Sequence, residues 1–146
     1  MPERFVRPVP YQELDHTADA GVAVRGKNKE EALARLVLAY ADLVTGGEPA
    51  AASSELTITV EAGDHAAMAV DVLRELLYRF DTEGLVPESC EVECFDPELG
   101  ARVRVGAGRY DPEAHAEGLA LKAVTLHAAR FEAEAGGWLA EVVFDV

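Results

Sequence analysis

Basic residues are scarce in this sequence of 146 residues, where 13 lysines and arginines stand against 27 aspartates and glutamates and the formal net charge is -14. A surface this acidic repels phosphate, so we expect no tight, direct binding of nucleic acid. The same field attracts metal cations and basic partner proteins. Long apolar runs are also missing, so the sequence predicts neither a signal peptide nor a membrane span and indicates a cytoplasmic protein.

Cysteine is nearly absent, with two residues in the whole chain. Both lie in one alternating segment, Cys90-Glu91-Val92-Glu93-Cys94. If that segment is a strand, the two Cα atoms lie roughly 13 Å apart at about 3.3 Å per residue. A disulfide needs less than about 7 Å. We therefore expect two buried thiols of the core rather than a disulfide or a zinc site.

The motifs that mark many independent enzymes are missing too. Gly106-Ala107-Gly108 lacks the strand-to-helix context of a phosphate-binding loop. No set of cysteines and histidines has the spacing of zinc ligands, and no serine lies in a nucleophile elbow. These absences argue against a protein that catalyses a reaction by itself.

Two helical stretches stand out in a chain whose length and hydrophobic fraction of 49% suit a single domain, 1–146, with residues 1–10 as an N-terminal tail. Apolar residues at i, i+3, i+4 and i+7 predict helices at about 29–44 and 65–81. Asp64 suits the N-cap of the second helix, and Gly84 is placed to end it. Alternating or short apolar segments predict strands at 21–26, 55–61, 88–95, 101–106, 119–127 and 138–146, with a short additional piece near 128–133.

The predicted order of elements is β-α-β-α-β-β-β-β, which favours the α+β class. We expect a mostly antiparallel or mixed sheet with two helices packed on one face. Because each helix carries a single apolar stripe, both should lie on the same side of one sheet. The other face of that sheet, or part of it, should then be open to solvent or to a partner.

A cluster of polar residues precedes the first clear strand, as Asp15-His16-Thr17-Ala18-Asp19. One interpretation is a polar turn in which the aspartates accept hydrogen bonds from backbone N–H groups. The other is a carboxylate site that holds a cation or a proton. The residues by themselves leave both interpretations open.

The C-terminus carries a second polar feature. Asp145 interrupts an otherwise apolar strand, and the terminal carboxylate of Val146 follows it directly. An unpaired charge there is costly if it is buried, so a partner is expected. The alternative is a frayed strand end with two solvated charges.

A third and weaker feature is the segment from Lys122 to His127, with His115 upstream. Thr125 and His127 point to one face of the predicted strand and Lys122 points to the other. A single histidine on a strand is more often structural than catalytic, so this feature alone assigns no function.

Several short segments follow one another along the chain in a characteristic order. They are Leu14-Asp15-His16-Thr17-Ala18-Asp19, Glu31-Ala32-Leu33, Glu75-Leu76-Leu77-Tyr78, Asp81-Thr82-Glu83-Gly84, His115, Lys122-Ala123-Val124-Thr125-Leu126-His127 and Phe144-Asp145-Val146. In order and spacing they resemble the archease family over nearly the whole chain from Tyr11. Each segment is short, and their combination is specific.

The resemblance implies a function that composition does not. Archeases act as cofactors of the RtcB-type RNA ligase of tRNA splicing, which joins RNA ends through a guanylylated histidine with GTP and manganese. The chain would then promote guanylylation and repeated turnover without being an enzyme itself. One alternative within the family is a chaperone that modulates the specificity of a tRNA cytosine methyltransferase. A less favoured one is an independent metal-dependent hydrolase that uses Asp15, Asp19, His127 and Asp145.

The resemblance also implies a divalent cation, with calcium favoured over manganese or magnesium, held by Asp19, Asp145 and the C-terminal Val146. Oxygen ligands suit these hard cations and not zinc. Three such groups are too few for the six to eight oxygens around calcium, so water, backbone or a partner must supply the rest. Candidates for positioning the ligands or contacting a partner are Asp15, His16, Thr17, His115, Lys122, Thr125 and His127.

Overall fold

A computed structural model describes residues 2–15 and 19–146 of the chain. These residues form eight strands and two helices, in an order that follows the predicted one after two additional N-terminal strands. The elements are β1 (Arg4–Val6), β2 (Gln12–Asp15), β3 (Asp19–Gly26), α1 (Lys29–Thr45), β4 (Ala52–Val60), α2 (His65–Glu83), β5 (Leu85–Asp96), β6 (Gly100–Arg109), β7 (Ala123–Glu134) and β8 (Gly137–Asp145).

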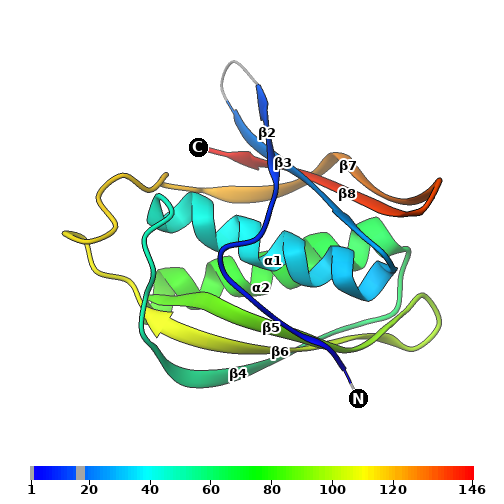
Figure 1. Cartoon of the computed structure of the whole chain (residues 1–146), viewed down its shortest axis with the longest axis horizontal. Coiled ribbons are helices and arrows are strands. Elements are labelled where there is room, and N and C mark those ends of the chain that lie inside the picture. Colours follow the sequence, from blue (N-terminus) through cyan, green and yellow to red (C-terminus); the bar gives the residue numbers. More distant parts are fainter. Residues whose placement is uncertain (1, 16–18) are drawn as a thin grey trace.

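The strands form two antiparallel sheets of four. Sheet A has the order β1-β5-β6-β4, and sheet B has the order β2-β3-β8-β7. Both helices lie between the sheets, as Figure 1 shows, with α1 packed on β5 and β3 and α2 packed on β7, β4 and β5. The α+β class is therefore confirmed, and each sheet carries the helices on one face. The difference from the prediction is that the strands divide into two sheets instead of one.

Helix α1 explains why two sheets are needed. Its predicted stripe includes Leu33 and Tyr40, but Ala34, Leu38 and Ala41, which lie between the stripe positions, are buried as well. A helix that is apolar around most of its circumference must be covered on more than one side. One sheet covers only one side of a helix, so the second sheet buries the rest.

The ends of both helices follow from local side-chain chemistry. Asn28 Oδ1 accepts a hydrogen bond from Glu31 N–H at 2.8 Å, and Asp64 Oδ1 accepts one from Ala67 N–H at 2.8 Å. The C-caps are Gly46 and Gly84, with φ of 68° and 67° in the left-handed region that glycine adopts without strain. The predicted N-cap at Asp64 and the predicted stop at Gly84 are confirmed.

The segment expected to be an N-terminal tail is anchored to the domain. Residues 4–6 pair with β5, and the Arg7 guanidinium beyond them lies in a pocket of acceptors. It donates to Glu88 Oε2 at 2.6 Å, to Thr45 Oγ1 at 2.7 Å and to Asp42 Oδ1 at 3.3 Å. The Arg7 side chain is only 5% exposed. This cluster fixes the chain start to the end of α1 and to β5.

Both cysteines are free, as predicted. Cys90 is fully buried, and burial raises the pKa of its thiol well above the ordinary range. Cys94 is only half-buried, and its Sγ lies 3.5 Å from the carbonyl oxygen of Gly100. No helix in the described part of the chain is long and apolar enough to cross a membrane.

Candidate functional site

Asp19 and Asp145 lie directly opposite each other in sheet B. Asp19 begins β3, Asp145 ends β8, and the antiparallel register pairs the two residues. Directly opposed residues have Cβ atoms about 4.5–5.5 Å apart and side chains on the same face. Phe144, the residue before Asp145, is fully buried against Tyr40 of α1. Because successive side chains of a strand point to opposite faces, the two carboxylates lie on the outer face of the sheet. The predicted meeting of Asp19 and Asp145 is thus present, where the start of β3 lies beside the end of β8 (Figure 1).

Strand β7 adds a third wall through a large bulge. Thr125 pairs with Val143, but the next pair is Arg130 with Glu141, so residues 126–129 stand opposite the single residue between those two. The bulge contains Ala128 at φ 63°, a left-handed conformation that costs energy for any residue except glycine. Such bulges re-aim side chains next to functional sites.

The bulge brings a histidine onto the same side as the two aspartates. Thr125 Oγ1 donates a hydrogen bond to the carbonyl oxygen of His127 at 2.9 Å and thereby fixes the turn. Val143 of β8 lies beneath the bulge and is only 6% exposed, although it faces away from the helices. A cavity of about 360 Å³ results, lined by Asp19, Thr125, His127, Ala128, Val143 and Asp145.

The cavity has a negative charge that is not locally balanced. Among residues 2–15 and 19–146, no basic side chain forms an ion pair with Asp19 or Asp145. Lys122 approaches Asp145 only through its backbone N–H, which donates to the Asp145 carbonyl at 2.8 Å. The Lys122 side chain instead lines a groove with Arg74 and Tyr78, between α2 and the start of β7. Its predicted orientation away from Thr125 and His127 stays a prediction.

The donor chemistry of this cavity fits a hard divalent cation. Two carboxylates on one face, beside the hydroxyl of Thr125, offer oxygen ligands of the kind that calcium, magnesium and manganese prefer. In the described residues no three side chains of His, Cys, Asp or Glu lie close enough to hold a metal ion. The protein side chains thus provide at most part of a coordination shell. The Val146 carboxylate as a third ligand stays a prediction.

The N-terminal members of the predicted site are only partly described. Asp15 ends β2 and pairs through the backbone with Ala20 of β3, so the two strands form a hairpin next to the cavity. His16 and Thr17, predicted to position ligands or contact a partner, lie outside the described residues.

His115 does not belong to the cavity. It is 1% exposed, and its Nδ1 accepts a hydrogen bond from Asp111 N–H at 2.8 Å. Because Nδ1 is an acceptor, Nε2 carries the proton and donates to the Pro49 carbonyl at 3.1 Å. The ring also lies against Tyr110, with centroids 5.3 Å apart. His115 was predicted to position ligands or contact a partner. In the structure it instead joins two surface loops through hydrogen bonds to Asp111 and Pro49.

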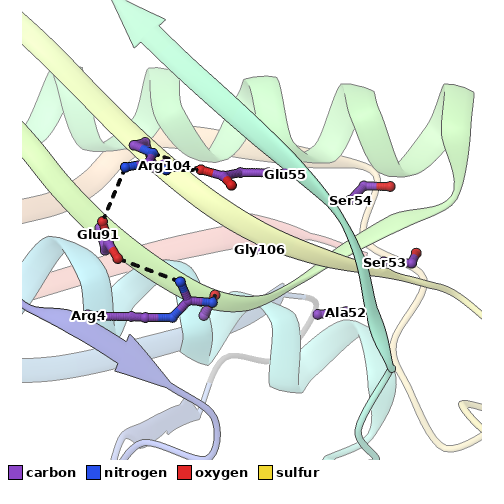
Figure 2. Close-up of a pocket in the computed structure, with 9 residues that line it drawn as sticks. Arg4, Ala52, Ser53, Ser54, Glu55, Glu91, Arg104 and Gly106 are labelled. Carbon is purple, nitrogen blue, oxygen red and sulfur yellow. Dashed lines mark hydrogen bonds and ion pairs between the residues drawn. The ribbon is translucent and has the colours of Figure 1, made fainter.

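A second cavity, of about 340 Å³, lies on the outer face of sheet A (Figure 2). Arg104 pairs with Glu55 and with Glu91, and Arg4 pairs with Glu91 and donates to Ser89 at 3.0 Å. The carboxylates here are neutralised by guanidinium groups, so the cavity offers no site for a cation. The only signal of this cavity in the sequence is the alternation of glutamates or arginines with valines along the two central strands, as in Glu91-Val92-Glu93 and Arg102-Val103-Arg104.

Comparisons with known proteins agree with the geometry. The sequence matches the archease protein family over residues 11–146. It is 35% identical to an archease of Methanopyrus kandleri over 94% of this chain and 100% of that protein, and 32% identical to one of Methanosarcina mazei over 93% and 95%. The solution structure of protein 1598 of Methanobacterium thermoautotrophicum superposes with a TM-score of 0.73 at 29% identity, covering 93% of this chain and 98% of that one.

A crystal structure from Thermotoga maritima, described as an archease and possible chaperone, shares the fold with a TM-score of 0.57 at 19% identity, over 96% of this chain and 100% of that one. The family match spans both carboxylates of the sheet B cavity and the bulge that closes it. The chain belongs to the archease family.

Proposed function

We propose that this protein activates an RtcB-type RNA ligase of tRNA splicing by promoting guanylylation and repeated turnover of that enzyme. Membership in the archease family supports the proposal. The observation that carries it is the unpaired carboxylate pair, Asp19 and Asp145, at the surface of sheet B. The description of the Thermotoga maritima relative as a possible chaperone is consistent with a protein that acts through a partner.

The carboxylate pair would hold one divalent cation, calcium, manganese or magnesium. The bound ion would supply a positive centre on an otherwise acidic face. Asp19 and Asp145 bind and orient it, and the Val146 terminus completes the protein's share of the ligands. Thr125 and His127 border the same cavity, so they are placed to contact whatever group of the ligase approaches. Because calcium takes six to eight oxygens, coordination positions remain for water or the ligase.

The decisive experiment compares turnover of the chain's own ligase with wild type, Asp19→Asn and Asp145→Asn, each with and without chelator. Both variants should lose most of the activation, because an amide keeps the shape of the side chain and removes its charge. Glu98→Gln is the matched control, since Glu98 is an exposed carboxylate in a distant turn. Full activation by both cavity variants would show that the cavity does not serve the ligase.

A screen of purified protein for phosphatase and nuclease activity with manganese separates this proposal from an independent hydrolase. The proposal expects no turnover without the ligase, because the sequence contains no recognisable nucleophile motif. A hydrolysis rate that disappears in Asp19→Asn and Asp145→Asn would overturn it. If the two variants still activated the ligase but no longer affected the specificity of a tRNA methyltransferase, the chaperone role would be favoured.

A further inference from the structure

The two sheets have four edge strands, and three of them are protected against pairing with another chain. β1 and β2 are short, with three and four residues. β7 is long, but the bulge at 126–129 interrupts it and the charged residues Arg130, Glu132 and Glu134 follow. Short length, bulges and charges are the usual means by which proteins block edge-to-edge association.

The fourth edge, β4, lacks these protections over most of its length. It has nine residues, and its six-residue part Glu55–Val60 runs without a bulge. That part contains no proline or lysine and a single charge, Glu55, which is already paired with Arg104. Its other residues are β-branched or leucine, the types that favour strands.

The backbone of β4 is open on its outer side. Within the described residues β4 pairs with β6 alone, and no other backbone hydrogen bond reaches it. Figure 1 shows β4 along the rim of the molecule, beyond β6. Every second residue of an edge strand presents unpaired N–H and C=O groups, which form a template for a further strand. Leu56 and Val60 are only half-buried there.

We propose that two copies of this chain associate through β4, antiparallel about a twofold axis at Thr57. The two sheets A would become one sheet of eight strands, four from each copy. This association does not rest on the proposed function, since β4 and the Asp19–Asp145 cavity belong to different sheets.

The residue pairs across this axis are chemically compatible. Leu56 would face Ile58 of the second copy on the helix side. On the outer side Glu55 would face Thr59 of the second copy, whose own neighbour on β6 is Arg102. Apolar pairs and paired threonines stabilise antiparallel strands, and like charges opposite each other destabilise them.

Shifting the axis by one residue is less favourable. An axis at Ile58 would place Glu55 opposite Glu61 of the second copy, at both ends of the ladder. An axis at Leu56 would place Ser54 opposite Ile58 of the second copy and would bring the bulge near Ser54 into the ladder. The register centred on Thr57 avoids both defects.

Net charge makes the association depend on salt. Each copy carries a formal charge of -14, so the two copies repel each other at long range. Salt screens that repulsion, with a Debye length of about 10 Å at 0.1 M. The dimer should therefore tighten as sodium chloride is raised, the opposite of an interface held by ion pairs.

Two lysine variants test the register with a matched pair. Thr57 and Thr59 are both exposed, and each lies beside an arginine of β6, Arg104 or Arg102. Thr57→Lys places two ammonium groups at the axis and should weaken the dimer by about fivefold or more in sedimentation equilibrium. Thr59→Lys places a lysine opposite Glu55 of the second copy and should keep or strengthen it. Far-UV circular dichroism checks that both variants fold.

Cysteine variants give a second readout of the same axis. Thr57→Cys should form an intermolecular disulfide on mild oxidation, because residue 57 faces its own copy. Thr59→Cys should not, because it faces residue 55. A wild-type protein that stays monomeric at high concentration and high salt, or equal behaviour of the two variants in each pair, would overturn the proposal. Recruitment of β4 by the ligase from a monomeric protein would overturn it as well.

Discussion

The outer face of sheet A and the Asp19–Asp145 end of sheet B differ in how their charges are balanced. On sheet A, Arg4 and Arg104 neutralise the glutamates beside them, and the charges form a connected ion-paired surface (Figure 2). On sheet B, Asp19 and Asp145 face each other without a basic partner among the described residues. Elsewhere on sheet B, Arg25 pairs with Glu134, and Arg130 pairs with Glu132 and Glu141. The chain has about half as many basic as acidic residues, and on sheet A these arginines are used in ion pairs with glutamates.

The comparison separates charges that hold the fold from charges that are available for function. Ion pairs on sheet A are satisfied within the chain and give a cation nothing to bind. The pair of carboxylates on sheet B is held together by backbone register, and the proposed cation would relieve the repulsion between them. Unbalanced charge at a rigid position is a better indication of function than charge as such.

Breaking the buried ion pairs of Arg7 should have the largest effect on stability. Arg7→Met removes the guanidinium that serves both Glu88 and Asp42, and leaves two poorly solvated carboxylates without a cation. Loss of one partner of a buried ion pair costs about 3–5 kcal/mol, so urea unfolding should show a loss of that size.

The control is Arg104→Met on the exposed face of sheet A. Arg104 has more carboxylate neighbours than Arg7, but its side chain is 46% exposed. Solvent screens exposed pairs, so the variant should lose little stability. Equal losses for the two variants would mean that burial does not distinguish the clusters.

Adding calcium should have the next largest effect, through the proposed site on sheet B. Ligand that binds only the native state stabilises it by about 2.7 kcal/mol at a concentration one hundred times Kd. Calcium should raise the melting temperature of wild type and leave Asp145→Asn nearly unchanged. Without calcium, Asp145→Asn should be at least as stable as wild type, because one of two opposed charges is gone. A calcium-dependent shift of equal size in the variant would place the cation elsewhere.

A third prediction concerns the place where the two sheets meet. The ring of His65, at the start of α2, packs against Phe95 of sheet A and Trp138 of sheet B, with centroids 5.0 and 5.2 Å apart. Burial, and then the charge of Lys29, lower the pKa of His65 from its ordinary value of 6.5, and three neighbouring carboxylates oppose that shift in part: Asp64, Glu30 and Asp96.

The sign of the pH effect follows from that direction. The unfolded chain binds a proton at His65 at a higher pH than the folded chain does, so the stabilisation is complete above pH 6.5. It is lost as the pH falls through 6.5 toward the folded pKa. The free energy of unfolding, measured from pH 8 to pH 5, should therefore fall less in His65→Phe than in wild type. The same fall in both proteins would exclude His65 as its source.

The sequence predicted the helices well because their signals are local. Asp64 caps α2 through a hydrogen bond three residues away, and Gly84 ends it in a conformation that glycine favours. β1 and β2 were missed, since strands of three and four residues are too short to show alternation. The second sheet was missed because the prediction assumed a single apolar stripe on α1. The alanines and Leu38 between the stripe positions are buried as well and need a second sheet to cover them.

The candidate site was predictable only in part, for a physical reason. Asp19 and Asp145 become neighbours through strand pairing between the chain ends, which no local pattern specifies, and the resemblance to archeases supplied that link. No sequence pattern around His115 indicates that its ring hydrogen-bonds to two loops. The bulge of β7 was equally hidden, because Ala128 is not a residue type that marks a left-handed turn.

That bulge gives the smallest expected effect on stability and sharpens the comparison of the two faces. Ala128 at φ 63° is strained, and glycine adopts this conformation freely but loses more entropy on folding. Ala128→Gly should therefore change the free energy of unfolding by less than about 1 kcal/mol, whereas the β-branched Ala128→Val should cost more than about 1 kcal/mol. If the bulge positions His127 and Thr125 for the ligase, Ala128→Val should also lower ligase activation at a temperature where the protein is fully folded. Calcium binding, which relies on Asp19 and Asp145 across β3 and β8, should change much less. A valine variant that binds calcium and activates the ligase like wild type would show that the strained turn serves neither role.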